Sequence, residues 1–125
     1  MKNETILVIE DNELNMKLVR SLLQIGNYTV LEAVNAEDGI SLARAHKPDL
    51  VLMDIQLPGM DGLAATKILK EDPRMEKIQV VAFSSYAMKG DSEKALESGC
   101  VGYISKPIDT RSFLNDIFRF INDGR

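Results

Sequence analysis

Hydrophobic residues follow two different spacings, and these spacings alternate along the chain. Short aliphatic or β-branched runs occur at 5–10, 28–33, 49–54, 78–83 and 101–105. The segments between them have apolar residues at every third or fourth position, at 13–25, 35–45, 62–70, 88–98 and 109–122, with 88–98 the most polar. The short runs predict buried β-strands, and the longer segments predict amphipathic helices.

The ends of the predicted helices are marked by residues that stop a helix. In the first helical segment the apolar positions are Leu14, Leu18, Leu22 and Ile25, and Gly26 follows at the expected end. The later stop signals are Lys47-Pro48, Asp72-Pro73 and Gly99. A proline disfavours a helical conformation in the residue before it, so each X-Pro pair closes a helical segment.

Five strands in strict alternation with five helices predict the fold class. Consecutive parallel strands need a crossover connection, which a helix supplies, and about 25 residues per strand–helix unit are enough for it. We therefore predict a single doubly wound α/β domain over 1–125, with a five-stranded parallel sheet and helices on both faces.

Composition and charge narrow the function classes. The 125 residues are 45% hydrophobic and 27% charged, as in ordinary globular proteins, and the net charge of −4 argues against a DNA-binding surface. With one cysteine, Cys100, and one histidine, His46, the chain has neither an internal disulfide nor the ligands of a zinc site. Its first residues do not form the hydrophobic region that a signal peptide needs, and no segment reaches the roughly 18 apolar residues of a membrane span. We expect a cytoplasmic protein that binds neither nucleic acid nor membrane.

Polar residues with complementary chemistry follow four of the five predicted strands. Glu10 and Asp11 follow the first strand, Asp54 ends the third, Ser84 follows the fourth, and Lys106 follows the fifth. Doubly wound sheets bind ligands at the carboxyl ends of their strands, where these side chains would lie. If the first and third strands are neighbours, three carboxylates converge on one crevice.

Three carboxylates in one crevice require a positive partner. Two like charges 4 Å apart repel by roughly 4 kcal/mol at an effective dielectric constant of 20. Mg²⁺ relieves this repulsion, because it prefers oxygen ligands and takes one or two carboxylates. Lys106 adds a second positive charge, and Ser84 adds a hydroxyl donor. These are the parts needed to form an aspartyl phosphate, and we predict Asp54 as the acceptor with Glu10 and Asp11 on the metal side.

Other polar residues have simpler explanations. Asp61 precedes a helical segment and is predicted to cap it. Asp49 and His46 fall at the opposite end of the sheet, so we predict a structural role for Asp49 and a surface position for His46. A surface histidine there disfavours a Ser-His-Asp hydrolase. Cys100 is predicted to be a small packing residue.

Four motifs carry a resemblance to a known family. They are VIEDN at 8–12, MDIQLPGMDG at 53–62, VVAFSS at 80–85 and YISKP at 103–107, and Asp54 precedes Ser84 by 30 residues and Lys106 by 52. With these motifs the chain resembles a two-component response-regulator receiver domain over essentially its whole length. EDNELNMKLV at 10–19 and AMKGD at 87–91 look most like the single-domain DivK-type regulators, although receivers within hybrid sensor kinases share the EDNELN start.

The resemblance implies a flavodoxin-like sheet with the strand order 2-1-3-4-5. It also implies that Asp54 accepts a phosphoryl group from a sensor histidine kinase or a histidine phosphotransfer protein. Mg²⁺ would bind directly to Asp11, to Asp54 and to the backbone carbonyl of Gln56, and to Glu10 through water. Such a chain is a signalling switch and not an enzyme, because it promotes only its own phosphorylation and dephosphorylation.

The resemblance further implies roles for residues around the acceptor. The Ser84 hydroxyl and the Lys106 ammonium would contact the phosphoryl group, and the Lys106-Pro107 peptide bond would be cis. Tyr103 would turn inward on phosphorylation and reshape the face formed by the fourth helix, fifth strand and fifth helix. A downstream protein would bind this face, and the chain would be a monomer or a phosphorylation-dependent dimer.

The chain departs from the commonest receiver pattern at a few positions near the site. Ser84 replaces the more usual threonine, and Glu10 stands where aspartate is often found. Gln56 and Tyr86 border the site and are predicted to modulate access to it. We expect Tyr86 to shield the phosphoryl group from water and so to slow self-dephosphorylation.

Other classes of protein share some of these site residues or this fold. A haloacid-dehalogenase-like phosphatase also has a strand-end aspartate and Mg²⁺, but it needs a second aspartate two residues on, where this chain has Gln56. A flavodoxin needs a phosphate-binding loop after the first strand, where Glu10 and Asp11 would repel an anion. The intact Asp54 and Lys106 argue against a receiver that only binds partners. The chain could also be the receiver portion of a larger hybrid kinase or transcriptional regulator; a complete chain would signal by protein–protein contact.

Overall fold

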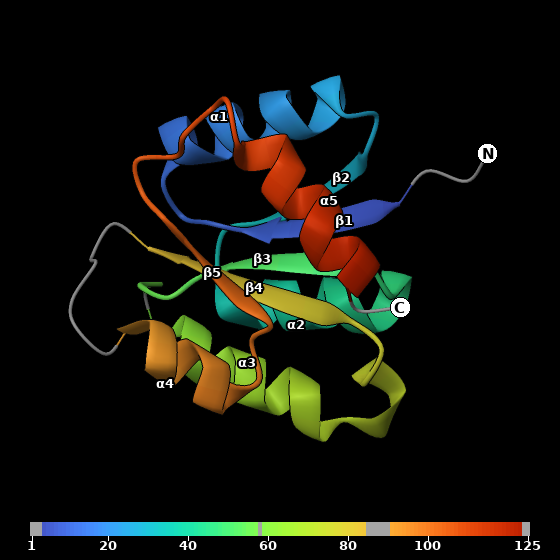
Figure 1. Cartoon of the computed structure of the whole chain (residues 1–125). Helices are drawn as coiled ribbons and strands as arrows, with labels where there is room; N and C mark the ends of the chain where they lie inside the picture. Colours follow the sequence, from blue (N-terminus) through green and yellow to red (C-terminus); the bar gives the residue numbers. More distant parts are fainter. Residues whose placement is uncertain (1–3, 58, 85–90, 124–125) are drawn as a thin grey trace.

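The sheet contains five parallel strands in the order β2-β1-β3-β4-β5, as the resemblance implies (Figure 1). A computed structural model describes residues 4–57, 59–84 and 91–123 of the chain. The strands are β1 (Thr5–Ile9), β2 (Thr29–Ala33), β3 (Leu50–Asp54), β4 (Gln79–Ser84) and β5 (Gly102–Ser105). Their bounds differ from the predicted runs by one residue at most, so the strand prediction is confirmed.

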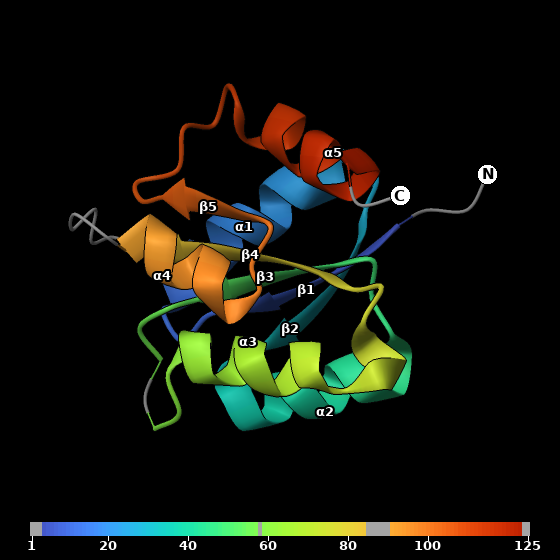
Figure 2. The same ribbon diagram turned by 60° about the horizontal axis from the view of Figure 1, so that its bottom comes forward.

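Helices cover both faces of this sheet, which confirms the doubly wound α/β fold. Helices α1 and α5 lie on one face, and α2, α3 and α4 lie on the other (Figures 1 and 2). The helices are α1 (Glu13–Ile25), α2 (Ala36–His46), α3 (Gly62–Glu71), α4 (Asp91–Ser98) and α5 (Phe113–Asp123), with a 3₁₀ helix η1 (Pro73–Met75) before β4. Within the described ranges, none of the helices has the length and apolar character that a membrane crossing requires.

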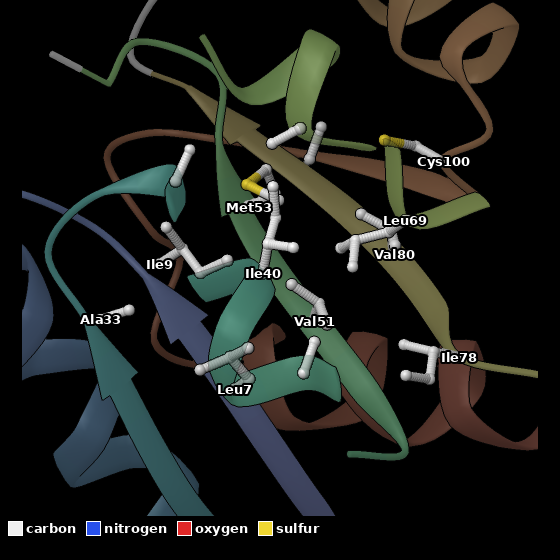
Figure 3. Close-up of a cluster of buried hydrophobic side chains, with 14 of the residues drawn as sticks. Leu7, Ile9, Ala33, Ile40, Val51, Met53, Leu69, Ile78, Val80 and Cys100 are labelled. Carbon is white, nitrogen blue, oxygen red and sulfur yellow. The ribbon is translucent and has the colours of Figure 1, made fainter. Parts of the chain in front are cut away.

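Two hydrophobic clusters, one on each face of the sheet, stabilise the fold. The cluster beneath α2 and α3 contains Leu7, Ile9, Val51, Met53 and Val80, among others (Figure 3). Alternate residues of the same strands form the second cluster with α1 and α5, because successive strand residues point to opposite faces. Every residue of the central strand β3 is buried. Asp54, the last residue of this strand, therefore lies at the carboxyl end of the most buried part of the sheet.

Helix α1 packs on the sheet through different apolar residues from those that dominate its sequence pattern. Its buried residues are Met16, Val19 and Leu23. In contrast, Leu14 is 78% exposed and Ile25 is 70% exposed. Both sets recur at helical spacing, so the pattern predicts the helix correctly but does not identify the stripe that faces the sheet.

The end of α1 agrees with the sequence prediction, whereas the start of α5 differs from it. Gly26 caps α1 with a φ of −80°, and the neighbouring Asn27 takes the left-handed conformation with a φ of 66°. Asparagine adopts this conformation more readily than most residues. Helix α5 begins at Phe113 and not at 109, because 110–112 form a turn. The Asp109 carboxylate stabilises that turn by accepting a hydrogen bond from the Arg111 N–H at 2.9 Å.

Candidate functional site

The carboxyl ends of β1, β3, β4 and β5 lie side by side along one edge of the sheet. Asp54, the last residue of β3, pairs with Phe83 of β4. Ser84 follows Phe83, and its carbonyl accepts a hydrogen bond from the Lys106 N–H at 2.8 Å. Glu10 directly follows β1, the neighbour of β3 on its other side. The strand order therefore brings together the strand-end residues that the sequence predicts as a site.

Three carboxylates form a cluster at this edge. Carboxylate oxygens of Glu10, Asp11 and Asp54 lie within 4.8 Å of one another. Glu10 is fully buried and Asp54 is 4% exposed, whereas Asp11 is exposed. Buried carboxylates are costly without positive partners, so Glu10 and Asp54 need a cation nearby.

Lys106 is the positive partner within the cluster, and its contacts are unequal. Its Nζ lies 2.7 Å from Glu10 Oε1 and 3.4 Å from Asp54 Oδ2. The ammonium also lies over the Phe83 ring, 4.6 Å from the ring centroid. The Lys106-Pro107 peptide bond is cis, as the resemblance implies. The sequence predicts a lysine at the site but does not predict Phe83 beside it.

The turn after β3 fixes the position of Asp54. The N–H of Gln56 donates a hydrogen bond to Asp54 Oδ1 at 3.0 Å. The N–H of Gly62 donates to the Ile55 carbonyl at 3.0 Å and closes the turn. A Cβ atom on Gly62 would lie 2.1 Å from the Asp54 carbonyl oxygen, so this close approach requires glycine.

In this turn the sequence predicts the role of Asp61 but not the requirement for glycine at position 62. Asp61 caps α3 by accepting a hydrogen bond from the Ala64 N–H at 2.8 Å, which confirms its predicted role. The pattern does not mark Gly62, because glycine after a Pro-Gly turn is ordinary. Glycine is required at position 62 because α3 packs closely against the end of β3, and the local sequence does not show this tertiary contact.

In the metal-free protein the surroundings of the cluster favour the protonated form of Asp54. Burial raises the pKa of Asp54 to about 7, and the hydrogen bond and charge of Glu10 act in the same direction, against the Gln56 N–H and the Lys106 charge. Burial also acts to raise the pKa of Glu10. That pKa is nevertheless lowered, because hydrogen bonds with Asp54 and Lys106 and the lysine charge outweigh burial. Of these two carboxyl groups, Glu10 therefore ionises more readily, beside Lys106, and Asp54 keeps a proton to higher pH.

The raised pKa of Asp54 predicts that its ionisation destabilises the fold. An unfolded aspartate has a pKa near 3.8. Between about pH 4 and 7 the folded protein therefore binds more protons than the unfolded chain, and its free energy of unfolding falls as the pH rises. Asp54→Asn removes this titration. Without Mg²⁺, we expect the variant to exceed the wild type in free energy of unfolding by about 1–3 kcal/mol at pH 8 and by much less at pH 5.

Urea unfolding of both proteins in EDTA at the two pH values measures this difference. The control is Asp61→Asn, which alters an exposed aspartate and retains a capping residue. Its stability relative to the wild type should be the same at both pH values. If Asp54→Asn and the wild type differ in free energy of unfolding by the same amount at pH 5 as at pH 8, the raised pKa of Asp54 is contradicted.

A family model for the response regulator receiver domain matches residues 6–118. The chain belongs to this family. Receiver domains are signalling domains of two-component systems and not enzymes in the ordinary sense.

Relatives and solved structures agree with this assignment. The polar-differentiation response regulator DivK of Brucella anthropi is 45% identical over 97% of this chain and 98% of its own length. The receiver domain of a sensor histidine kinase from Pseudomonas aeruginosa is 26% identical, with a TM-score of 0.88 over 97% of this chain and 99% of that one. A CheY-like receiver domain protein of Methanospirillum hungatei, 24% identical, shares the fold with a TM-score of 0.90 over 98% and 97% of the two chains.

The acidic cluster of this receiver domain fits a magnesium ion. Its carboxylates offer only oxygen ligands, which a hard cation prefers. Glu10 Oε2 is buried and has no hydrogen-bond partner among the described residues. A divalent cation would also offset the negative charge that raises the pKa of Asp54. The Pseudomonas receiver structure contains a magnesium ion coordinated in its active site cleft.

The structure describes the remaining predicted site residues, with one exception. Ser84 is 1% exposed at the end of β4. Tyr103 on β5 is half-buried and packs against the cluster beneath α2 and α3. Pro107 is exposed and follows Lys106 in the turn after β5. Tyr86 lies outside the described residues, as does the start of the predicted segment 88–98.

Proposed function

We propose that this receiver domain, spanning residues 1–125, is a phosphorylation switch of a two-component phosphorelay. Asp54 accepts a phosphoryl group from a phosphohistidine of a sensor histidine kinase or a histidine phosphotransfer protein. The observation that carries this proposal is the meeting of the buried Asp54 with Lys106 and two further carboxylates at one edge of the sheet.

The transfer forms one bond and breaks one. An ionised Asp54 oxygen attacks phosphorus, the P–N bond of the phosphohistidine breaks, and its electron pair returns to the imidazole nitrogen, which takes up a proton. Mg²⁺ supplies positive charge that favours the ionised carboxylate and neutralises the transferred oxygens. Asp11, Asp54 and the Gln56 backbone carbonyl would bind the ion directly. Glu10 would bind it through water.

Lys106 and Ser84 are proposed to stabilise the phosphorylated form. Lys106 Nζ already lies 3.4 Å from Asp54 Oδ2, and Ser84 is buried at the end of the adjacent strand. Both groups can donate hydrogen bonds to phosphoryl oxygens. Gln56 is exposed beside the Asp54 carboxylate, which supports a role in controlling access of water. We propose the same control of water access for Tyr86 from the sequence alone, because Tyr86 lies outside the described residues.

The output is proposed to be protein–protein contact through the face formed by α4, β5 and α5. Phosphorylation adds about −1.5 to −2 charges, and Tyr103 would move inward as the site reorganises. Exposed apolar residues on or beside this face support a binding role: Leu96 is 55%, Val101 41% and Phe118 64% exposed. We infer a cytoplasmic protein that does not bind nucleic acid directly and is a monomer or a phosphorylation-dependent dimer.

Incubation with a small phosphodonor tests this function. We expect acetyl phosphate to add one phosphoryl group per wild-type chain when Mg²⁺ is present, and intact-mass spectrometry measures the gain. The same incubation in EDTA should give no gain, because the clustered carboxylates then lack their cation. Magnesium-independent labelling, or no labelling at saturating donor, would contradict the proposal.

A further inference from the structure

The aromatic ring of Phe83 lies against the Lys106 ammonium at the carboxyl end of the sheet. Nζ is 4.6 Å from the ring centroid, within the range of a cation–π contact, in which the negative face of the ring attracts the ammonium. Phe83 is 1% exposed and belongs to the hydrophobic cluster that packs against α1 and α5. At Phe83 this apolar cluster therefore meets the charged residues of the site.

The register of the strands explains how the ring comes to lie there. Phe83 of β4 is paired with Asp54 of β3, and paired residues of neighbouring strands point to the same face of a sheet. On its other side Phe83 is paired with Ile104 of β5, two residues before Lys106. The ring and the acceptor carboxylate thus start from adjacent positions, and the lysine reaches both from the next strand.

The ring occupies a side of the ammonium that water would otherwise occupy. An ammonium has three N–H donors, and Lys106 Nζ lies 2.7 Å from Glu10 Oε1 and 3.4 Å from Asp54 Oδ2. The lysine side chain is only 11% exposed. Its flexible stem would ordinarily carry the charge out to solvent. The aromatic face offsets this tendency, whereas an aliphatic side chain would offer the ammonium only dispersion contacts.

We propose that Phe83 is a positioning residue, whose aromatic face holds the Lys106 ammonium beside Asp54 and thereby speeds the phosphorylation of Asp54. This inference rests on the proposed function. It adds that the lysine is in place before the phosphodonor arrives, so that less of its attraction to the phosphoryl oxygens is lost in ordering the side chain. Phe83 does not contact the reacting atoms and acts only through Lys106.

Phenylalanine analogues with one, two or three ring fluorines at position 83 test this role. Fluorine withdraws electron density from the face of the ring and changes the shape of the side chain little, so packing is largely kept. The initial rate is measured by intact mass with acetyl phosphate and saturating Mg²⁺. We expect the rate to fall with each added fluorine and to be about three- to tenfold below the wild-type rate with three.

The same fluorinated series at position 113 is the matched control. Phe113 is 2% exposed in the same hydrophobic cluster, and among the described residues no cation lies over its ring. Fluorination there disturbs the packing of the cluster to a similar extent without affecting a cation–π contact. The rates of this series should stay within about twofold of the wild type.

The NMR shifts of the lysine protons report the contact without any need for phosphorylation. Protons close to an aromatic face resonate upfield, so the ε-methylene protons of Lys106 in EDTA should lie upfield of those of Lys67, an exposed lysine on α3. Phe83→Leu should abolish this upfield shift. Lys106 protons at the position of the Lys67 protons in the wild type would overturn the proposed contact.

The kinetic outcomes separate this inference from the function on which it rests. Equal rates across the series at position 83 would overturn the role of the ring, because Phe83 would then be a packing residue only. An equal fall in the series at position 113 would overturn it for the same reason. Absence of phosphorylation in the wild type at saturating donor would instead contradict the proposed function itself, and the role of Phe83 with it.

Discussion

Asp54→Asn is expected to abolish magnesium-dependent phosphorylation, lowering the initial rate at least about 100-fold. The amide has nearly the same shape as the carboxylate, but it carries no negative charge and its nitrogen is not a nucleophile. The substitution also removes one of the three carboxylates of the cluster. Asp54 is 4% exposed, and the Gln56 N–H fixes the position of its carboxylate.

The rate is measured by intact mass over time with acetyl phosphate and saturating Mg²⁺. Asp61→Asn is the matched control, since it makes the same chemical change at the other end of the same turn and keeps the cap on α3. The control should be phosphorylated at the wild-type rate within about twofold, because Asp61 is exposed and its interactions are local. Phosphorylation of Asp54→Asn at more than a tenth of the wild-type rate would exclude Asp54 as the principal acceptor.

Gly62→Ala is expected to lower both stability and phosphorylation. In an open helix, alanine would be favoured over glycine by about 1 kcal/mol. Here the new Cβ would lie 2.1 Å from the Asp54 carbonyl oxygen and 2.9 Å from Ile55 Cα, and these backbone atoms can move only if β3 or α3 moves. We expect a loss of about 2–4 kcal/mol in the free energy of unfolding and at least a tenfold slower phosphorylation, because Asp54 is displaced.

Gly26→Ala is the matched control for this substitution. A Cβ at Gly26 would meet the side-chain atoms of Leu114 and Tyr28 at 2.9–3.2 Å, and these ends can adjust. Its φ of −80° suits any residue. Urea unfolding should show a loss of no more than about 1 kcal/mol, and the phosphorylation rate should match the wild type. A Gly62→Ala protein as stable and as active as Gly26→Ala would show that the close approach to Asp54 is unimportant.

The predicted site could be read from the sequence because each residue has a local marker. Asp54, Ser84 and Lys106 each stand where a strand of β-branched or aliphatic residues stops, and parallel strands place those ends at one edge. Glu10 and Asp11 follow the same rule on the neighbouring strand. The residues of the site are therefore fixed by strand ends and strand order, which short aliphatic or β-branched runs and the helical segments between them predict well.

Contacts among these residues were not predictable in the same way. Strand spacing places Lys106 near two carboxylates but does not show that it binds Glu10 more closely than Asp54; that depends on side-chain length and on Phe83. Gly62 is essential only because α3 packs directly on the end of β3.

Helix α1 gives a further example of what local spacing leaves open. Its two apolar stripes have the same period, and only tertiary packing selects Met16, Val19 and Leu23 over Leu14 and Ile25. The start of α5 was predicted four residues early for a similar reason, since a local turn at Asp109 replaces the first helical turn. Spacing thus predicts elements, and side-chain geometry decides their faces and ends.

The most direct test of the central claim is the location of the phosphoryl group itself. The protein is phosphorylated with acetyl phosphate and Mg²⁺ and then treated with borohydride, which reduces an acyl phosphate to an alcohol and so converts a phosphorylated aspartate to homoserine. Peptide mass spectrometry then identifies the converted residue. We expect homoserine at position 54 alone, and only in samples that contained both donor and Mg²⁺. Conversion at Asp11 or Glu10, or a stable phosphoryl group on Ser84, would contradict Asp54 as the acceptor.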